Sequence, residues 1–192
     1  MAPDDLDDDC WLLLHDVRLR GVVDGSDATI EVRVVEAGLA ARASKGLRLT
    51  PAGRERHTEW ARVRETEVEA AMERAYQRFL TLNRELIRLC NDWQVRPGGV
   101  PNDHSDPRYD WAIVDRLVAI DDRVAPILRS TASRVTRFAG YRPRLRAARE
   151  RVHEGEHEWL TSPRIDSYHT VWMQLHEDLL LALGLDRASE GD

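Results

Sequence analysis

The stretch GLRLTPAGRE, Gly46 to Glu55, predicts a strand that runs directly into a capped helix. Leu47 and Leu49 alternate with polar neighbours, as in a half-buried strand. Thr50-Pro51 then places an N-cap residue before a proline at the first helical position. The preceding LAARASK completes a hairpin over about residues 39–50, with its turn at Ser44-Lys45-Gly46.

Upstream of the hairpin, residues 5–20 predict a helix with an aspartate-rich first turn that ends at Gly21. Only sixteen residues, 22–37, separate it from the next terminating glycine, Gly38. Their TIEVRVVE segment alternates like a strand, whereas Asp27 and Gly38 bracket it like a helix. We expect a helix, with the strand as the open alternative.

Downstream of the hairpin the chain predicts helices. A long helical region follows Pro51, with a possible break near RHTEWARV, and ends at the loop RPGGVPNDHSDPR, residues 96–108. Apolar spacing then predicts further helices at about 109–123, 126–138 (restarting at Pro126), 142–160 and 165–183. We therefore expect a mainly α protein, with a domain over residues 1–60 and an α-helical bundle over 61–192.

Composition limits the classes of function. The 192 residues carry a net charge of −6, which argues against general attraction to nucleic acid but leaves room for local basic faces over residues 42–64 and 137–151. Cys10 and Cys90 lack metal-type spacing and are expected to be buried thiols. The sequence shows no secretory leader and no apolar run of membrane-spanning length, so we expect a soluble cytoplasmic protein without a membrane partner.

The segment EAGLAARASKGLRLTPAGRE, Glu36 to Glu55, resembles MarR- and PadR-like winged-helix regulators and similar domains in actinobacterial proteins. The resemblance covers about residues 10–60. It implies a homodimeric transcriptional regulator with duplex DNA as partner, and a helical part that dimerises or senses a small-molecule effector. In that interpretation Arg42, Lys45 and Arg48 of the wing contact phosphates, and Arg33 is the candidate for base contact.

The sequence also departs from that family. A helix-turn-helix needs two helices and a turn, whereas residues 22–37 accommodate one helix. The candidate helix offers Arg33 as its only basic residue. An alternative is therefore a helical interaction or ligand-sensing protein whose winged domain has lost DNA binding and serves as a docking or dimer surface.

A remote alternative is a zinc-dependent hydrolase that uses HEGEH. His153 and His157 have the spacing that places two imidazoles on one face of a helix. Gly155 weakens such a helix, and the charged neighbours are unusual for a buried metal helix. The sequence gives no other enzyme motif and no cofactor signature.

Aromatic and imidazole side chains suggest a ligand pocket in the bundle. His169, Trp172 and His176 share one side of the last helix, where they either line a pocket for a planar or acidic ligand, hold a metal, or belong to the core. Trp93 ends a helix that faces the 96–108 loop, and His104 lies in that loop. The acids of the stretch PNDHSDPRYD, residues 101–110, are ligand-like in type but also typical of turns and helix caps: Asp103, Asp106 and Asp110.

Overall fold

The computed structural model describes residues 6–23 and 27–186, and the chain forms two compact units. Unit 1 comprises Met1–Glu65 together with Glu177–Asp192, and unit 2 comprises Thr66–His176. The described residues 177–186 thus group with unit 1.

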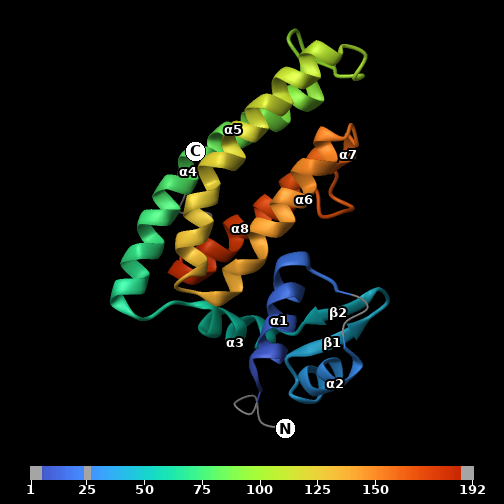
Figure 1. The fold of residues 1–192 in the computed structure, drawn as a ribbon. Coiled ribbons are helices and arrows are strands. Elements are labelled where there is room, and N and C mark those ends of the chain that lie inside the picture. The colour runs from blue at the N-terminus through green and yellow to red at the C-terminus, as the bar shows by residue number, and fades with distance from the viewer. Residues whose placement is uncertain (1–5, 24–26, 187–192) are drawn as a thin grey trace. The chain divides into compact units, whose positions relative to one another are not determined.

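Unit 1 contains a short hairpin among helices (Figure 1). Helix α1 (Asp8–Arg20) is followed by α2 (Ala28–Glu36), strands β1 (Ala40–Ala43) and β2 (Gly46–Leu49), and α3 (Pro51–Ala61). The helix expected within residues 22–37 is confirmed, because Asp27 caps α2 by accepting a hydrogen bond from the Thr29 N–H at 2.8 Å. Within the described part of residues 22–37, α2 is the single helix.

The GLRLTPAGRE stretch joins the hairpin to α3 through Thr50 and Gly53. The Thr50 hydroxyl accepts a hydrogen bond from the Gly53 N–H at 3.0 Å and donates one to the Gly38 carbonyl at 2.7 Å. A Cβ atom added at Gly53 would lie 1.9 Å from the Leu39 carbonyl oxygen. Only glycine therefore lets the first turn of α3 approach the start of the hairpin this closely.

The core of unit 1 lies between α1, α2 and the hairpin. Val23 forms an isolated antiparallel bridge to Leu47, so three extended segments lie side by side. The buried apolar residues of this core are Leu6, Cys10, Leu13, Leu14, Val17, Val34, Leu39, Ala40, Leu47 and Leu49.

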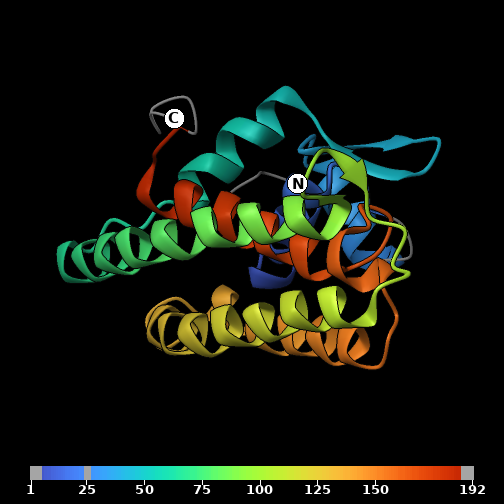
Figure 2. The same cartoon turned by 90° about the horizontal axis from the view of Figure 1, so that it is seen from above.

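Unit 2 is built on two long helices, α4 (Thr66–Gln94) and α5 (Pro107–Ala132), which lie side by side in both views (Figures 1 and 2). A small hairpin of β3 (Val95–Arg96) and β4 (Val100–Pro101) reverses the chain between them. After α5 come the 3₁₀ helix η2 (Thr136–Gly140) and the helices α6 (Tyr141–His153), α7 (Glu158–Thr161) and α8 (Tyr168–Leu183). The coarse prediction of a mainly α fold with one N-terminal hairpin is confirmed, and the β3–β4 hairpin was not predicted.

Two predicted helix boundaries are wrong. Pro126 does not restart a helix but lies inside α5, where buried Val124, Ile127 and Leu128 continue the apolar stripe across it. Their burial offsets the roughly 3 kcal/mol that an interior proline costs. Conversely, the helix expected over 142–160 ends at His153, because Gly155 adopts a positive φ of 88°.

The expected break after Pro51 is present, since α3 ends at Ala61 and α4 begins at Thr66. Among the described residues, no helix combines the length and the apolar character needed to cross a membrane.

Candidate functional site

Two of the four candidate DNA-contacting side chains in unit 1 form ion pairs with acidic side chains. The Arg33 guanidinium donates to the Asp7 carboxylate at 2.6 Å. The Arg42 guanidinium donates to the Glu31 carboxylate at 2.9 Å, with Glu31 largely buried. A phosphate would therefore compete with a carboxylate for each of these guanidinium groups, although the Arg42 side chain is 63% exposed.

The wing bases also lie on different sides of the hairpin. Arg42 pairs with Leu47, and Arg48 pairs with Ala41, in the antiparallel register. Directly paired residues share a face and adjacent residues point to opposite faces, so Arg42 and Arg48 face opposite ways. Lys45 lies at the turn. The three bases therefore do not form one phosphate-facing row.

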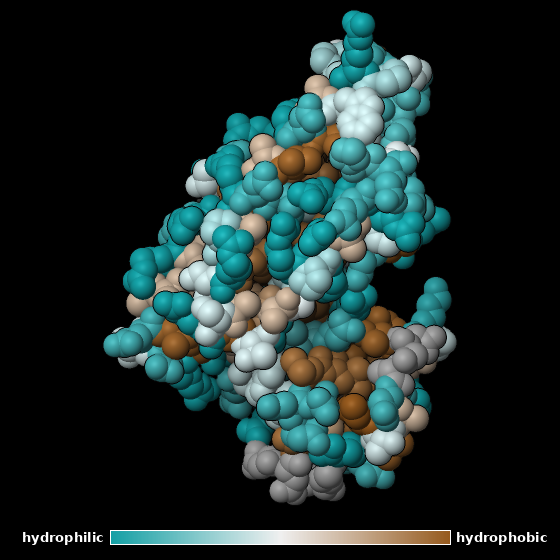
Figure 3. Space-filling model, viewed as in Figure 1, coloured by the Kyte–Doolittle hydropathy of each residue, from teal (hydrophilic) through white to brown (hydrophobic). Residues whose placement is uncertain are grey.

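Lys45 and Arg48 are exposed. In Figure 3, however, hydrophobic side chains gather on the visible face of unit 1 among the hydrophilic ones. Val22 and Val32 contribute exposed apolar surface to this unit.

The second basic run, in α6, forms ion pairs inside unit 2. Arg142 and Arg149 donate to the fully buried Asp121 carboxylate at 2.7 and 3.0 Å. The Tyr168 hydroxyl donates to the same carboxylate at 3.3 Å, and burial together with that negative charge raises the pKa of Tyr168. This run holds α5, α6 and α8 together.

The predicted ligand-binding residues divide into two places in unit 2. Trp172 and His176 pack in the core against α4, where the Trp172 ring stacks on Phe79 at 4.8 Å. Trp93 lies fourteen residues beyond Phe79 on the same helix, which is about 21 Å at 1.5 Å per residue. Trp172 and His176 therefore do not share a pocket with Trp93.

His169 lies half-buried on α8, and burial lowers its pKa. The buried Trp172 indole donates to the Asn83 side-chain oxygen at 2.9 Å, which satisfies its single donor. Of the alternatives for this side of α8, these contacts fit side chains that belong to the core.

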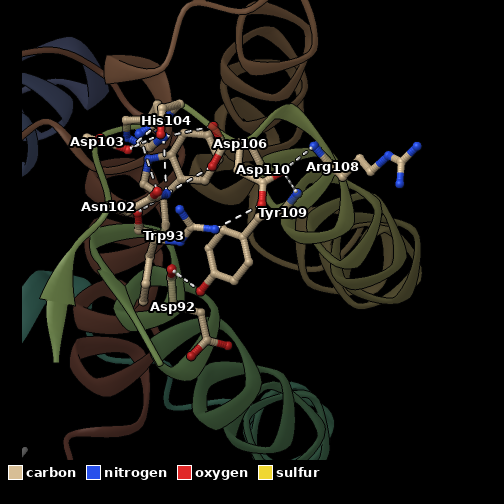
Figure 4. A network of polar contacts seen from close by, with 11 residues as sticks. Asp92, Trp93, Asn102, Asp103, His104, Asp106, Arg108, Tyr109 and Asp110 are labelled. Carbon is tan, nitrogen blue, oxygen red and sulfur yellow. Dashed lines mark hydrogen bonds and ion pairs between the residues drawn. The ribbon is translucent and has the colours of Figure 1, made fainter. Parts of the chain in front are cut away.

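Trp93 and His104 do meet, at the end of α4 (Figure 4). Their ring centroids are 4.5 Å apart. Asn102 links both segments, because its amide donates to the Trp93 carbonyl at 3.1 Å and to the Asp110 carboxylate at 2.9 Å. The loop is thereby tied to α4 and to the first turn of α5.

Asp110 and His157 complete this cluster, which we call the His104 site: Trp93, Asn102, His104, Asp110 and His157. His104 Nδ1 lies 3.0 Å from Asp110 Oδ2, and the His157 ring lies 4.5 Å from the His104 ring. Asn102 Nδ2 also lies 3.2 Å from His104 Nδ1. Because an ionised carboxylate only accepts hydrogen bonds, a hydrogen bond between His104 Nδ1 and Asp110 has the imidazole as donor.

Local structure positions each member of the His104 site. Gly98 and Gly99, both with positive φ, turn the chain between β3 and β4. Asp106 caps α5 by accepting from the Arg108 and Tyr109 N–H groups, which places Asp110 one turn into the helix. His104 itself has a φ of 58°, and among the described residues no other non-glycine has a positive φ.

The HEGEH histidines do not share a helix face. His153 is the last residue of α6, and its ring contacts Trp111 at 5.2 Å. His157 precedes α7 and contacts Trp93 and His104. The helix that a zinc-protease motif requires is not formed.

Sequence reasoning missed a buried polar cluster in unit 1. His15 Nδ1 lies 3.0 Å from His57 Nε2, and His15 Nε2 lies 3.1 Å from Asp178 Oδ2. All three side chains are buried, from α1, α3 and α8. No spacing rule joins positions so far apart, and the cluster ties the C-terminal part of α8 to the other helices of unit 1.

Comparisons with protein-family models, with curated proteins and with solved structures found no match to this chain.

Proposed function

We propose that the chain is a ligand-sensing or interaction protein whose unit 1 is a reduced winged-helix-like module that docks partners and does not read duplex DNA. The observation that carries the ligand-binding part is the His104 site. The end of α4, the following loop and the start of α5 bring an indole, an imidazole and a carboxylate together with the imidazole of His157, which is distant in sequence, in unit 2.

The chemistry of the His104 site suits a ligand more than a structural role alone. His157 is exposed, whereas Asp110 is buried, so the cluster reaches from solvent into the unit. Asp110 already has two hydrogen-bonding neighbours, and His157 adds no hydrogen bond that the loop needs to fold. The exposed His157 imidazole beside His104 therefore supports the proposal that a ligand binds here.

Thermal unfolding with added ligands tests this proposal. Zinc chloride, inorganic phosphate and benzoate represent a cation, an anion and an aromatic acid. A ligand that binds only the folded protein raises the midpoint temperature in proportion to the logarithm of its concentration. We expect at least one of the three to stabilise the wild type and His153→Ala but not His157→Ala. Stabilisation by none, or stabilisation that survives in His157→Ala, would contradict the proposal.

The second candidate is a DNA-binding regulator that uses the wing. Exposed Lys45 and Arg48 favour it. It predicts saturable binding of a fluorescent duplex at low salt that weakens steeply as salt is added and is lost in Lys45→Glu/Arg48→Glu. Our proposal predicts equal, weak signals for the wild type and the charge-reversed variant, because Lys45 and Arg48 are not part of one phosphate-facing row with Arg42.

A cytoplasmic location is part of the same proposal. It is supported by two buried free thiols, Cys10 and Cys90, which suit a reducing compartment.

A further inference from the structure

We infer that His104, Asp110 and His157 bind a divalent transition-metal ion, with zinc as the first choice. This inference rests on the proposed function, since it names the ligand of the His104 site. A metal is the ligand class for which two imidazoles and one carboxylate supply the complete set of protein donors.

The distances place the donors near what a metal requires. One donor atom from each of the three residues lies within 4.8 Å of the other two. Tetrahedral zinc with bonds of 2.0–2.1 Å separates neighbouring ligand atoms by about 3.4 Å. His104 Nδ1 and Asp110 Oδ2, which are 3.0 Å apart, already lie close to that separation. His157 then needs only a small side-chain movement, which its exposure permits.

The neighbours of the donors hold them in place. The Asn102 amide donates a hydrogen bond to Asp110 Oδ1 at 2.9 Å, and the other oxygen, Oδ2, faces His104. The Trp93 ring lies against both imidazoles, at 4.5 Å from His104 and 5.3 Å from His157. Such surrounding contacts orient ligands and shield the ion from bulk solvent on one side.

Three protein ligands leave a fourth position open on the side of exposed His157. Closed structural zinc sites have four protein ligands, whereas sites with three hold water or an exchangeable small molecule. An open position fits a site that senses a metal or a metal-bound small anion better than a site that merely supports the fold.

A simpler account is that His104 and Asp110 form a hydrogen-bonded pair and that His157 only packs beside it. The two accounts differ at His157, which the pair does not need and the metal does. His153 provides a matched control, because it is an exposed histidine four residues away whose ring contacts Trp111 instead. It also separates this site from the HEGEH hypothesis, which requires both histidines.

The test is zinc titration of the full chain, freed of metal by a chelator and dialysed, with isothermal calorimetry as readout. We expect one zinc per chain for the wild type and for His153→Ala, with affinities within about twofold. His157→Ala and Asp110→Asn should each weaken binding by at least about tenfold, the scale on which even supporting residues act. His104→Asn should do the same, and asparagine tolerates the positive φ at that position.

Cobalt(II) gives a second readout, because its visible absorption reports the coordination geometry of the bound ion. The wild type should show the intense visible absorption of a four-coordinate cobalt site, and His157→Ala should lose it. Circular dichroism of each variant verifies that the fold is kept. Absence of stoichiometric zinc in the wild type overturns the inference, as does an equal loss in His153→Ala and His157→Ala. If zinc fails while benzoate or phosphate stabilises the wild type through His157, the metal is wrong and the ligand site stands.

Discussion

Asp7 stabilises the start of α1 through two contacts. Its carboxylate accepts a hydrogen bond from the Arg33 guanidinium at 2.6 Å and from the Cys10 N–H at 3.1 Å. These hydrogen bonds, that from Arg33 first, lower the pKa of Asp7 from 3.8 to about 2. The same contact engages the one basic side chain of α2, so a single residue joins two helices and removes a candidate base reader.

The lowered pKa of Asp7 predicts a specific acid sensitivity. A carboxyl whose pKa is lower in the folded state stabilises that state while ionised, and this contribution is lost as the pH falls from 3.8 towards 2. Asp7→Asn keeps the cap but has no charge to lose. Its unfolding midpoint should therefore fall less than that of the wild type over this interval. Asp8→Asn, at the next position, should follow the wild type, and parallel curves for wild type and Asp7→Asn would contradict the prediction.

The two thiols are predicted to be unreactive in the folded protein. Burial raises the pKa of Cys90 to about 12, and burial followed by the hydrogen bond to Asp7 raises the pKa of Cys10. Because the thiolate is the reacting species, a chromogenic disulfide reagent at pH 8 should label neither rapidly. Both should react fully in denaturant. Rapid labelling of Cys90 in folded Cys10→Ser protein would show that its environment is more open than described.

At the scale of elements, the junction of the hairpin and α3 depends on a glycine. Alanine at Gly53 would place its Cβ 1.9 Å from the Leu39 carbonyl oxygen, and a backbone atom cannot move aside as a flexible side chain would. Gly53→Ala should lower the free energy of unfolding by about 3 kcal/mol, measured by urea denaturation.

Gly140 is the matched control for that substitution. It has a φ of −70°, and a Cβ there meets nothing within 4 Å. Gly140→Ala should leave stability unchanged or raise it by about 0.5 kcal/mol. Equal effects of the two substitutions would show that the contact with Leu39 is not tight.

The cap of α3 gives an independent prediction. Thr50→Ala removes the oxygen that accepts from the Gly53 N–H and the donor to the Gly38 carbonyl. It should cost about 1 kcal/mol in urea denaturation, whereas Thr50→Ser, which keeps the hydroxyl, should remain close to the wild type. A loss of similar size in both variants would point to the threonine methyl group instead.

Local signals predicted the elements that depend on neighbouring residues. Thr50, Pro51 and Gly38 act on backbone groups within a few positions, so the hairpin, its cap and α2 could be predicted. Pro126 and Gly155 led to opposite errors in the predicted helix ends. Buried residues on both sides of Pro126 keep α5 continuous, so the predicted helix start there was wrong. Gly155 adopts a positive φ and α6 ends before it, so the predicted continuation of that helix was wrong. The loop 96–108 was predicted as a loop, but its small hairpin was not.

At the scale of the whole molecule, the chain consists of two units with different chemistry. In unit 1 a hairpin leads into a capped helix, and acids engage Arg33 and Arg42. In unit 2, Arg142 and Arg149 of the basic run contact the buried Asp121, and the exposed imidazole of His157 lies at the His104 site. Lys45 and Arg48 remain exposed in unit 1, and in unit 2 the rings of Trp93, His104 and His157 lie together.

The His104 site could be predicted only in part. Trp93, His104 and the acids of the loop are close in sequence, so the sequence indicated their type and neighbourhood. His157 lies 53 positions beyond His104, and its spacing with His153 suggested a different partner. Side chains that meet through the packing of distant helices leave no periodic signal, which is also why the His15, His57 and Asp178 cluster was missed.

Anomalous diffraction at the zinc absorption edge, from crystals of the full chain grown with zinc, tests the central claim most directly. We predict one strong peak bounded by His104, Asp110 and His157 in the wild type and no peak there in His157→Ala. A peak at His153, or a site between these three residues that holds no zinc in the wild type, would contradict it.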